Sequence, residues 1–226
     1  GMQEETIELK VGAVVWATGW KPYDAAKIQP YGYDRFANVI TSVEFERMCD
    51  PHGPTGGRIL RPSDGKEAKN VAFIQCAGSR EQYADAEVHI YYIDIRAIDR
   101  FEDFYRKVQQ DATVGFVKSK VAKIVQDEKT GDVVLHGVDT EGYNRYATPH
   151  DLAVLAVGME PSIKGIKLPE DIVLDSSGFI ETAGEGMFSA GCATNALDVN
   201  RAVQNATAAS LRAIQVINKT AGTEAA

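Results

Sequence analysis

The chain has 226 residues and a formal net charge of −8, which argues against a general nucleic-acid binder and against a basic protein of membrane surfaces. Its 44% hydrophobic and 25% charged residues are those of a globular protein large enough for one or two domains. No apolar run approaches the roughly 20 residues of a membrane-spanning helix, and no signal peptide is recognisable. We therefore expect a cytoplasmic protein without a membrane span of its own and without a nucleic-acid partner.

Cysteine and histidine spacing argues against a metal centre. The three cysteines, Cys49, Cys76 and Cys192, lie far apart and are odd in number, so they predict neither a disulfide framework nor a zinc or iron–sulfur site. The four histidines are scattered, without the spacing of metal ligands. We expect no metal site in this chain and a reducing compartment around it.

Two copies of one pattern organise the chain. Residues 14–22 and 154–161 each contain an apolar strand, a Gly, two further residues and a Pro. A buried strand must leave its sheet abruptly, Gly permits a turn with positive φ, and Pro fixes the exit. A more polar strand that could pair with each copy precedes it, at 6–11 and at 133–138. Tandem dinucleotide-binding domains typically carry this signature once each.

A short helix and a long loop are predicted after the first copy. Residues 42–49 read as a helix, with Thr41 or Ser42 as its N-cap and Glu44 in its first turn. The following stretch, 50–66, is dense in Gly and Pro and must be turn or loop.

The middle of the chain shows an α/β pattern consistent with a parallel sheet. Only residues 77–87 separate its first two strands, whereas a parallel crossover usually needs a dozen or more residues. Either the crossover helix is a stub, or residues present in relatives are missing here. The predicted elements are strands at 71–76 and 88–93, a helix at 100–109, and strands near 113–118 and 121–126.

The last 40 or so residues are the most informative. A short strand, 187–190, runs into Gly191 and a sharp turn, and a long amphipathic helix opens around Asp198. Flavoproteins with two dinucleotide-binding domains use this layout to close over the ribityl chain and pyrimidine edge of FAD. The N-terminus of a helix offers unpaired N–H groups and a partial positive charge, which favour electron density at the N1/C2=O edge of a reduced flavin. We expect one helix face to be core, with Val203, Ala206, Leu211, Ile214 and Ile217.

Eight residues are candidates to border the cofactor. Two follow the first strand, and six lie in the last turn and at the start of the last helix. They are Thr18, Gly19, Gly191, Cys192, Ala193, Asp198, Val199 and Asn200.

Several of these candidates have simpler alternatives. Asp198 can be an ordinary N-cap, worth about 1 kcal/mol, and Thr18 and Gly19 can be a strand exit. Cys192 stands where most such flavoproteins have an Asp, and a thiol is a weak, uncharged acceptor. We expect it to line the FAD site without redox activity and the ribityl contact to shift to backbone groups. The alternatives are a small apolar filler or a reactive thiol near a helix N-terminus.

Other motifs are absent or carry little weight. No Gly-x-Gly-x-x-Gly follows a strand, and Gly78 alone cannot form a phosphate cradle, so we do not expect nicotinamide binding even though Asp94 ends a strand. We identify no catalytic residue. Asn205-Ala-Thr207 matches the glycosylation pattern, but it lies in a predicted helix and we interpret it as chance. Arg80, Arg96 and Lys118 could face a partner or an anionic flavin, but surface cations are the default expectation.

Together, longer motifs over nearly the whole chain resemble the C-terminal portion of the heterodisulfide reductase A-subunit family. The resemblance is strongest to the flavoprotein A-subunit of the quinone-interacting membrane-bound oxidoreductase complex of sulfate-reducing organisms. The most specific part is the pair Gly53-Pro-Thr-Gly-Gly57 and Arg61-Pro-Ser-Asp-Gly-Lys66. The other segments are 15–22, 31–33, 38–47, 73–80, 92–97 and 186–192.

The resemblance implies an FAD-binding electron carrier with a thioredoxin-reductase-like fold. Such proteins work in cytoplasmic or membrane-associated complexes with iron–sulfur and quinone-reactive subunits. This chain departs from the family in lacking the N-terminal Gly-x-Gly-x-x-Gly unit and the cysteine-rich stretch after Arg80. We predict a split FAD-binding part, residues 1–66 and 160–226, and an inserted second dinucleotide-binding-like domain, 67–159.

Three functions remain to be compared. The first is an FAD-dependent electron-transfer subunit or a fragment of one. The second is an interaction module of such a complex without a cofactor. The third, a complete pyridine-nucleotide disulfide reductase, is disfavoured because the sequence has neither a redox dithiol nor a nicotinamide cradle.

Overall fold

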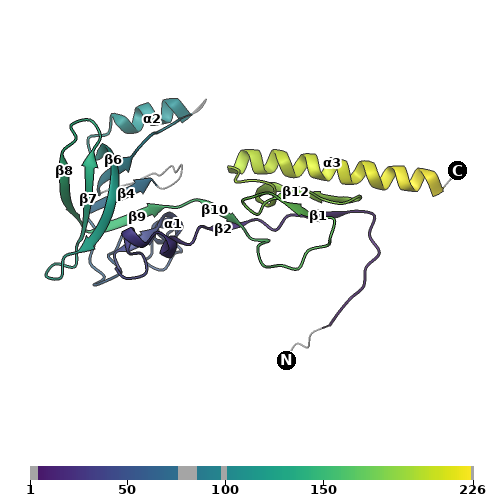
Figure 1. Cartoon of the computed structure of the whole chain (residues 1–226), viewed down its shortest axis with the longest axis horizontal. Coiled ribbons are helices and arrows are strands. Elements are labelled where there is room, and N and C mark those ends of the chain that lie inside the picture. The colour runs from purple at the N-terminus through teal and green to yellow at the C-terminus, as the bar shows by residue number, and fades with distance from the viewer. Residues whose placement is uncertain (1–4, 76–85, 98–100, 225–226) are drawn as a thin grey trace. The chain divides into compact units, whose positions relative to one another are not determined.

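The computed structural model describes residues 5–75, 86–97 and 101–224 (Figure 1). The chain divides into two compact units, each considered by itself below. The terminal unit comprises Gly1–Pro22 and Met159–Ala226, and the sheet unit comprises Tyr23–Gly158. Residues 23–66, which the sequence analysis grouped with the FAD-binding part, belong to the sheet unit.

The sheet unit is built on a mixed seven-stranded sheet in the order β3-β9-β4-β5-β6-β7-β8. The pairs from β3 to β6 are parallel, and β6, β7 and β8 form an antiparallel meander. The bounds are β3 Val39–Thr41, β4 Asn70–Gln75, β5 Glu87–Tyr92, β6 Val114–Gln126, β7 Val133–Asp139, β8 Arg145–His150 and β9 Leu152–Ala156.

The centre of this sheet is buried on both faces, as expected for parallel strands. Every residue of β9 is buried, and alternate residues enter opposite clusters because successive side chains point to opposite faces. Leu155 packs with Ile74 in one cluster, whereas Val154 packs with Phe73 in the other.

Within the described residues, two α-helices and two short 3₁₀ turns complete the sheet unit. The predicted helix at 42–49 is confirmed as α1, Ser42–Cys49, with Thr41 as its N-cap. The Glu44 N–H donates to Thr41 Oγ1 at 3.3 Å, and the Thr41 N–H donates to Glu44 Oε2 at 2.7 Å, which completes a capping box. The remaining bounds are α2 Phe101–Gln109 and the 3₁₀ turns Ala25–Lys27 and Gln29–Tyr31.

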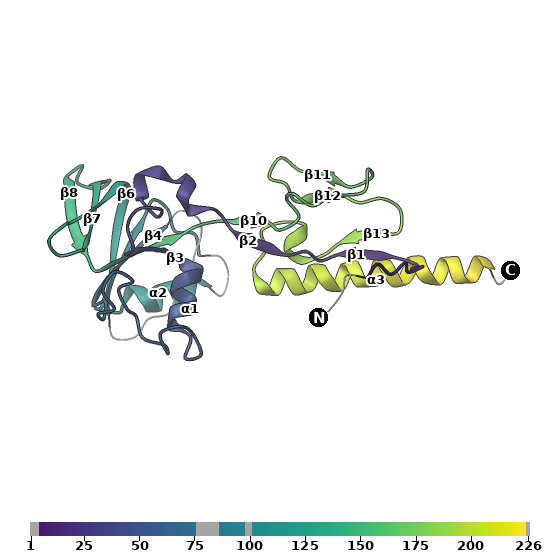
Figure 2. The same cartoon turned by 90° about the horizontal axis from the view of Figure 1, so that it is seen from below.

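The terminal unit holds three two-stranded pairings and one long helix, α3 (Figure 2). β1 pairs in parallel with β13, and β2 pairs with β10 in antiparallel fashion. α3 contacts both β1 and β13. The bounds are β1 Val14–Trp16, β2 Trp20–Pro22, β10 Met159–Pro161, β11 Val173–Leu174, β12 Ile180–Thr182, β13 Met187–Ser189, a 3₁₀ turn Gly191–Ala193 and α3 Val199–Glu224.

The two copies of the internal pattern pair with each other through their last three residues. These residues are β2 in the copy at 14–22 and β10 in the copy at 154–161. Gly19 has φ +71°, as predicted for such an exit, whereas Gly158 does not have a positive φ. The polar partner strands were predicted wrongly. Residues 6–11 form no strand, and β7 pairs with β6 and β8 rather than with β9. The partners of β1 and β9 come instead from distant parts of the sequence.

Two further corrections concern the meander. The predicted strands 113–118 and 121–126 are one strand, β6, with an irregular register between Val121 and Lys123. The sequence analysis also missed β8, whose exposed and buried residues alternate without a strong apolar signal.

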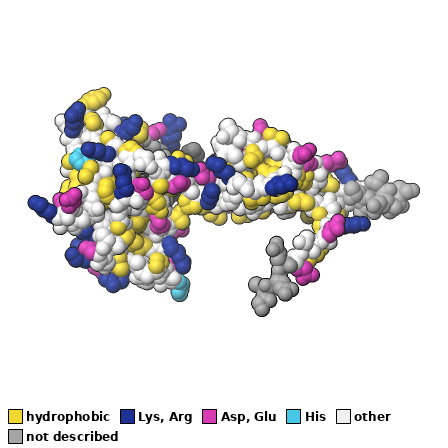
Figure 3. Space-filling model, turned by 60° about the horizontal axis from the view of Figure 1, so that its bottom comes forward, with side chains coloured by type: hydrophobic (Ala, Val, Ile, Leu, Met, Phe, Trp, Pro, Cys, Tyr) yellow, Lys and Arg dark blue, Asp and Glu magenta, His cyan; other side chains and the backbone are white. Residues whose placement is uncertain are grey.

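The predicted core face of α3 is wrong for four of its five residues, while the fifth, Ala206, is half-buried. Of the described helix residues, Ala209 and Ala213 are buried, whereas Val203 is 60% and Leu211 56% exposed. A two-stranded pair such as β1–β13, which α3 contacts, is too narrow to cover a wide apolar face. Ile214 and Ile217 are also more than 40% exposed. Figure 3 shows hydrophobic side chains at the surface of this unit.

Candidate functional site

The candidate residues for cofactor binding come together at one edge of the terminal unit. β1 and β13 are parallel, so the segments that leave their carboxyl ends start at the same edge. The Ala190 N–H donates to the Trp16 carbonyl at 2.9 Å, which ties the two strand ends together. This edge therefore brings Thr18 and Gly19 to the Gly191 turn.

The Gly191 turn requires glycine for its backbone conformation. Gly191 has φ +61°, which side chains other than glycine adopt only at a cost. A Cβ added at this position would have no heavy atom within 4 Å. The turn therefore borders open space. Residues other than glycine are disfavoured at position 191 by backbone strain and not by a steric clash.

Hydrogen bonds fix both polar backbone groups of Gly191. Its N–H donates to Asn205 Oδ1 at 2.7 Å. Its carbonyl accepts the Thr194 N–H at 3.0 Å and the Thr194 hydroxyl at 2.7 Å. The Asn205 contact anchors the end of β13 to the second turn of α3, and the Thr194 contacts close the turn itself.

The next two residues differ in their surroundings. Cys192 is a free, half-buried cysteine whose thiol donates to the Leu197 carbonyl at 3.5 Å. Ala193 is fully buried in the apolar cluster with Ile163 and Ile172. The side chain of Ala193 is therefore core, and only its backbone can face a ligand.

α3 begins where the sequence predicts. Asp198 Oδ1 accepts the Arg201 N–H at 2.9 Å, and the Asp198 carbonyl accepts the Ala202 N–H at 2.8 Å, so Asp198 is the N-cap. Val199 and Asn200 form the first turn, whose N–H groups lack intrahelical acceptors by geometry. This helix N-terminus presents backbone donors and a partial positive charge.

The exit of β1 contains a polar group without a partner. Among the described residues, the Thr18 hydroxyl oxygen is buried without a hydrogen bond, and so is Trp16 Nε1. A Cβ added at Gly19 would have no heavy atom within 4 Å. A buried hydroxyl is costly when it has no partner. The orphaned hydroxyl, the open space and the helix N-terminus fit a ligand with hydroxyl and carbonyl groups, as in the ribityl chain and pyrimidine ring of FAD.

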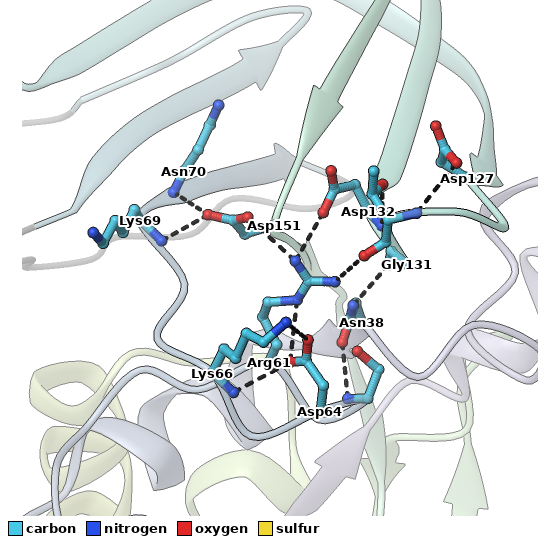
Figure 4. Close-up of polar contacts among 12 residues, drawn as sticks. Asn38, Arg61, Asp64, Lys66, Lys69, Asn70, Asp127, Gly131, Asp132 and Asp151 are labelled. Atoms are coloured by element: carbon cyan, nitrogen blue, oxygen red, sulfur yellow. Dashed lines mark hydrogen bonds and ion pairs between the residues drawn. The ribbon is translucent and has the colours of Figure 1, made fainter.

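In the sheet unit, the motif of residues 61–66 has a structural role (Figure 4). Arg61 is only 8% exposed. Its Nη1 donates to Asp132 Oδ1 at 2.8 Å, and its Nη2 donates to the Thr130 carbonyl at 2.8 Å. Asp64 and Asp151 lie 3.4 and 3.5 Å from the guanidinium. Arg61 thus clamps its own loop to the turn between β6 and β7.

Asn38 completes this clamp from the residue before β3. It is fully buried, its Nδ2 donates to the Gly131 carbonyl at 2.9 Å, and its Oδ1 accepts the Ser63 N–H at 3.0 Å. The backbone N–H of Lys66, with smaller contributions from nearby cations, holds the pKa of Asp64 below its usual value. The roles of Arg61 and Asn38 in this clamp are therefore contacts within the fold: both Arg61 Nη atoms and the Asn38 amide have hydrogen-bond partners in the protein, whereas Arg61 Nε has only the ion pair with Asp64 at 3.4 Å.

A second buried polar cluster surrounds His150. Its Nε2 lies 3.0 Å from the Tyr91 hydroxyl and its Nδ1 2.5 Å from Asn70 Oδ1. Burial, with a smaller effect of His89, lowers the pKa of His150 to about 4. A neutral ring that donates from Nδ1 and accepts at Nε2 satisfies both contacts. This cluster joins β4, β5 and the end of β8.

A groove of about 760 Å³ also opens on the sheet unit. Apolar and aromatic side chains from the segment before β3 and from α1 form most of its lining, together with Pro54 and Pro62. The Tyr33 hydroxyl donates to Glu44 Oε1 at 2.9 Å. Burial and Glu44 raise the pKa of Tyr33 to about 12, so this phenol stays neutral. The sequence analysis did not identify this groove.

Several weaker candidates are surface groups or lie outside the described residues. Asp94 and Arg96 pair at 2.6 Å and are largely exposed, and Lys118 is exposed. Cys76, Gly78, Arg80 and nearly all of the short crossover 77–87 lie outside the described residues. In the described ranges, no three His, Cys, Asp or Glu residues cluster as metal ligands do, and no helix is long and apolar enough to cross a membrane.

The sequence is similar to curated proteins of methanogens. It is 33% identical over 249 residues to the iron–sulfur A-subunit 2 of the CoB–CoM heterodisulfide reductase of Methanopyrus kandleri, covering 93% of this chain and 38% of that protein. It is also 33% identical to the A-subunit of the H(2):CoB-CoM heterodisulfide,ferredoxin reductase of Methanothermobacter thermautotrophicus, with the same coverage of both chains. The chain thus spans about 38% of the length of these relatives. A search against protein-family models finds no match.

The fold is similar to that of thioredoxin reductases. The enzyme of Lactococcus lactis superposes with a TM-score of 0.59 at 12% identity, covering 92% of this chain and 66% of that structure. The thioredoxin reductase of T. acidophilum gives the same TM-score at 14% identity, with the same coverage. The predicted α/β fold of the thioredoxin-reductase type is therefore confirmed, and at these identities the likeness concerns the fold alone.

Proposed function

The chain belongs to the heterodisulfide reductase A-subunit family over the portion that it spans, and on this premise we propose that it forms part of an FAD-dependent electron-transfer subunit. The complex would be a heterodisulfide-reductase-like or quinone-interacting oxidoreductase. One observation carries the proposal. The orphaned Thr18 hydroxyl and the open space at Gly19 follow β1, Gly191 with its open space follows the parallel strand β13, and Asn205 links the Gly191 turn to α3.

Eight residues would hold the cofactor in this proposal. The Thr18 hydroxyl and the backbone around Gly19 and Gly191 would contact the ribityl chain. Cys192 would line the site without a redox role, since its thiol is directed to the backbone carbonyl of Leu197. The remaining contacts would come from the backbone of Ala193, Asp198, Val199 and Asn200.

Bound FAD supplies one- and two-electron transfer, and the residues of this chain position it and adjust its potential. The first turn of α3 would favour negative charge at the pyrimidine edge through its N–H groups. The negative charge of the Asp198 carboxylate opposes part of the positive potential of the helix N-terminus. Its ion pair with Arg201, at 3.8 Å, reduces this opposing effect. No side chain of this site is proposed to transfer a proton.

The partners are inferred from the relatives. One relative is named an iron–sulfur subunit and another a ferredoxin reductase subunit. We propose iron–sulfur redox subunits as partners on the basis of these names, and quinone-reactive subunits and a cytoplasmic place with association to a membrane complex on the basis of the sequence resemblance alone. The terminal unit would carry the flavin, and the sheet unit would be the second dinucleotide-binding-like domain without nicotinamide.

A second function is favoured by the outer face of α3. Val199 is 82% exposed, and Val203, Leu211, Ile214 and Ile217 are 43–60% exposed. An apolar face of this kind marks an interaction surface in soluble proteins. The chain would then be a cofactor-free interaction module that packs this face against another polypeptide of the complex.

Absorption spectroscopy distinguishes the two functions. The purified chain is incubated with FAD, freed of excess by gel filtration and scanned between 350 and 550 nm (roughly the range of flavin absorption), and its melting temperature is measured with and without saturating FAD. A retained flavin band and a raised melting temperature support the flavin site. A colourless protein with an unchanged melting temperature supports the interaction module.

A further inference from the structure

Asn205 lies on α3, outside the eight residues assigned to the cofactor, and it is half-buried. Its Oδ1 accepts the Gly191 N–H at 2.7 Å across 14 residues of sequence. Other polar side chains of α3, such as Thr207 and Ser210, donate to carbonyls of their own helix. The amide of Asn205 instead joins the helix to the turn after β13.

This contact restrains a turn that is open to solvent. Gly191 adopts a left-handed conformation, and no heavy atom lies within 4 Å of where its Cβ would be. Packing therefore does not hold the turn on that side. Thr194 binds the Gly191 carbonyl from within the same turn, whereas Asn205 provides the only described hydrogen bond from Gly191 to α3. Asn205 thereby sets where the turn lies relative to the helix N-terminus.

We propose that Asn205 is a positioning residue of the flavin site, which fixes the Gly191 turn and the N-terminus of α3 relative to each other. The inference rests on the proposed function, because these two elements are the ones assigned to the ribityl chain and to the pyrimidine edge. A rigid arrangement of donors lowers the cost of ordering them when a ligand binds. Asn205 itself need not touch the flavin.

The contact also explains the sequence pattern Asn205-Ala-Thr207. The pattern matches a glycosylation acceptor, yet the amide oxygen of Asn205 is engaged with the Gly191 N–H and the Thr207 hydroxyl with the Val203 carbonyl. The two side chains therefore have structural partners.

The test compares Asn205→Ala, Asn205→Asp and Asn218→Ala with the wild-type chain. Asn218 is an exposed asparagine of the same helix and provides the matched control. Amide hydrogen exchange at Gly191 is measured by NMR without FAD, and the FAD dissociation constant is measured by fluorescence titration. Asn205→Asp keeps an acceptor oxygen and adds a negative charge.

Asn205→Ala is expected to raise Gly191 exchange about tenfold, as for one lost hydrogen bond, and to weaken FAD binding by about the same factor. Asn205→Asp should retain the protection of Gly191 and lower the flavin reduction potential, because its added charge disfavours the reduced, anionic flavin. Asn218→Ala should change none of these quantities. A purely structural role would change the melting temperature of Asn205→Ala but leave its FAD affinity equal to that of Asn218→Ala.

The failures of the two proposals are distinguishable. If the wild-type chain binds FAD and Asn205→Ala binds it equally well, the positioning role is overturned and the flavin site stands. Unchanged Gly191 exchange in Asn205→Ala likewise overturns the positioning role. If the wild-type chain binds no FAD, the proposed function fails, and the inference about Asn205 fails with it.

Discussion

Replacement of Arg61 by Ala is expected to destabilise the sheet unit by about 3 kcal/mol. The guanidinium is 9% exposed and makes two hydrogen bonds of 2.8 Å, one to the Asp132 carboxylate and one to the Thr130 carbonyl. Hydrogen bonds of charged groups contribute about 1.5–3 kcal/mol each. The carboxylates of Asp64, Asp132 and Asp151 are 24–30% exposed, so water partly solvates them after the change. We therefore expect a loss at the lower end of the sum for the two hydrogen bonds, about 3 kcal/mol.

Arg58→Ala is the matched control for this prediction. Arg58 is three residues earlier and also pairs with a carboxylate, that of Glu67 at 2.9 Å, but both side chains are about 60% exposed. Such a surface pair is worth about 0–1 kcal/mol. Native-state hydrogen exchange of the β9 amides reports the free energy of unfolding of this unit. A loss below 1 kcal/mol for Arg61→Ala, or equal losses for the two variants, would refute the argument that burial makes this clamp strong.

Three further predictions address pH dependence, helix capping and the packing of α3. The folded-state pKa of His150, about 4, lies below its ordinary value of 6.5, so the unfolded state takes up a proton first and stability falls as the pH drops from about 6.5 towards 4. Urea denaturation should show that the free energy of unfolding falls by about 2 kcal/mol between pH 7 and pH 5 because of this group. His150→Gln should reduce this fall. An equal fall in the variant would exclude His150 as its cause. Thr41→Ala, which removes a capping box, should cost about 1 kcal/mol in thermal denaturation, and no change would show that the cap is dispensable. Leu211→Glu should change the stability by less than about 0.5 kcal/mol, while Ala213→Glu, at a buried position, should cost several times more; the reverse order would restore the predicted core face of α3.

Local signals in the sequence predicted those elements whose stabilising contacts are local. The cap at Thr41 with Glu44 three residues later defines the start of α1, and Asp198 defines the start of α3. Gly19 and Gly191 both have positive φ values, as their places after apolar strands suggest. The two caps meet their partners within three positions, and the glycine conformations follow from local turns, so each of these features is readable from a short window.

Tertiary contacts decided the features that sequence analysis missed. The partner of β1 is β13, near the other end of the chain. The sequence around β1 therefore gives no sign of its actual partner, and residues 6–11 are the nearest segment that could pair with it. On α3, Ala209 and Ala213 are buried, whereas the larger apolar residues stay exposed. Hydrophobic periodicity indicates that a helix has an apolar face, but the width of the surface below decides which residues are buried.

The sequence indicated the candidate residues of the site, but not the hydrogen bonds that connect them. The grouping of Thr18, Gly19 and the Gly191 turn follows from the parallel pairing of β1 and β13, and the residues fit the chemistry of a flavin. The link from Asn205 to Gly191 could not be predicted, since an asparagine in a helix has no distinctive pattern. The role of Arg61 was equally hidden, because its partners lie on a turn far along the chain.

The most direct test of the central claim is the visible absorption spectrum of the chain after incubation with FAD and removal of the excess, measured side by side for the wild type and Gly191→Val. Valine is disfavoured at a positive φ, so it should distort the turn while Asp198 still caps α3. We expect a flavin band in the wild type and a band reduced at least several-fold in the variant. A colourless wild-type protein, or equal bands in both proteins, would contradict a flavin site at the Gly191 turn.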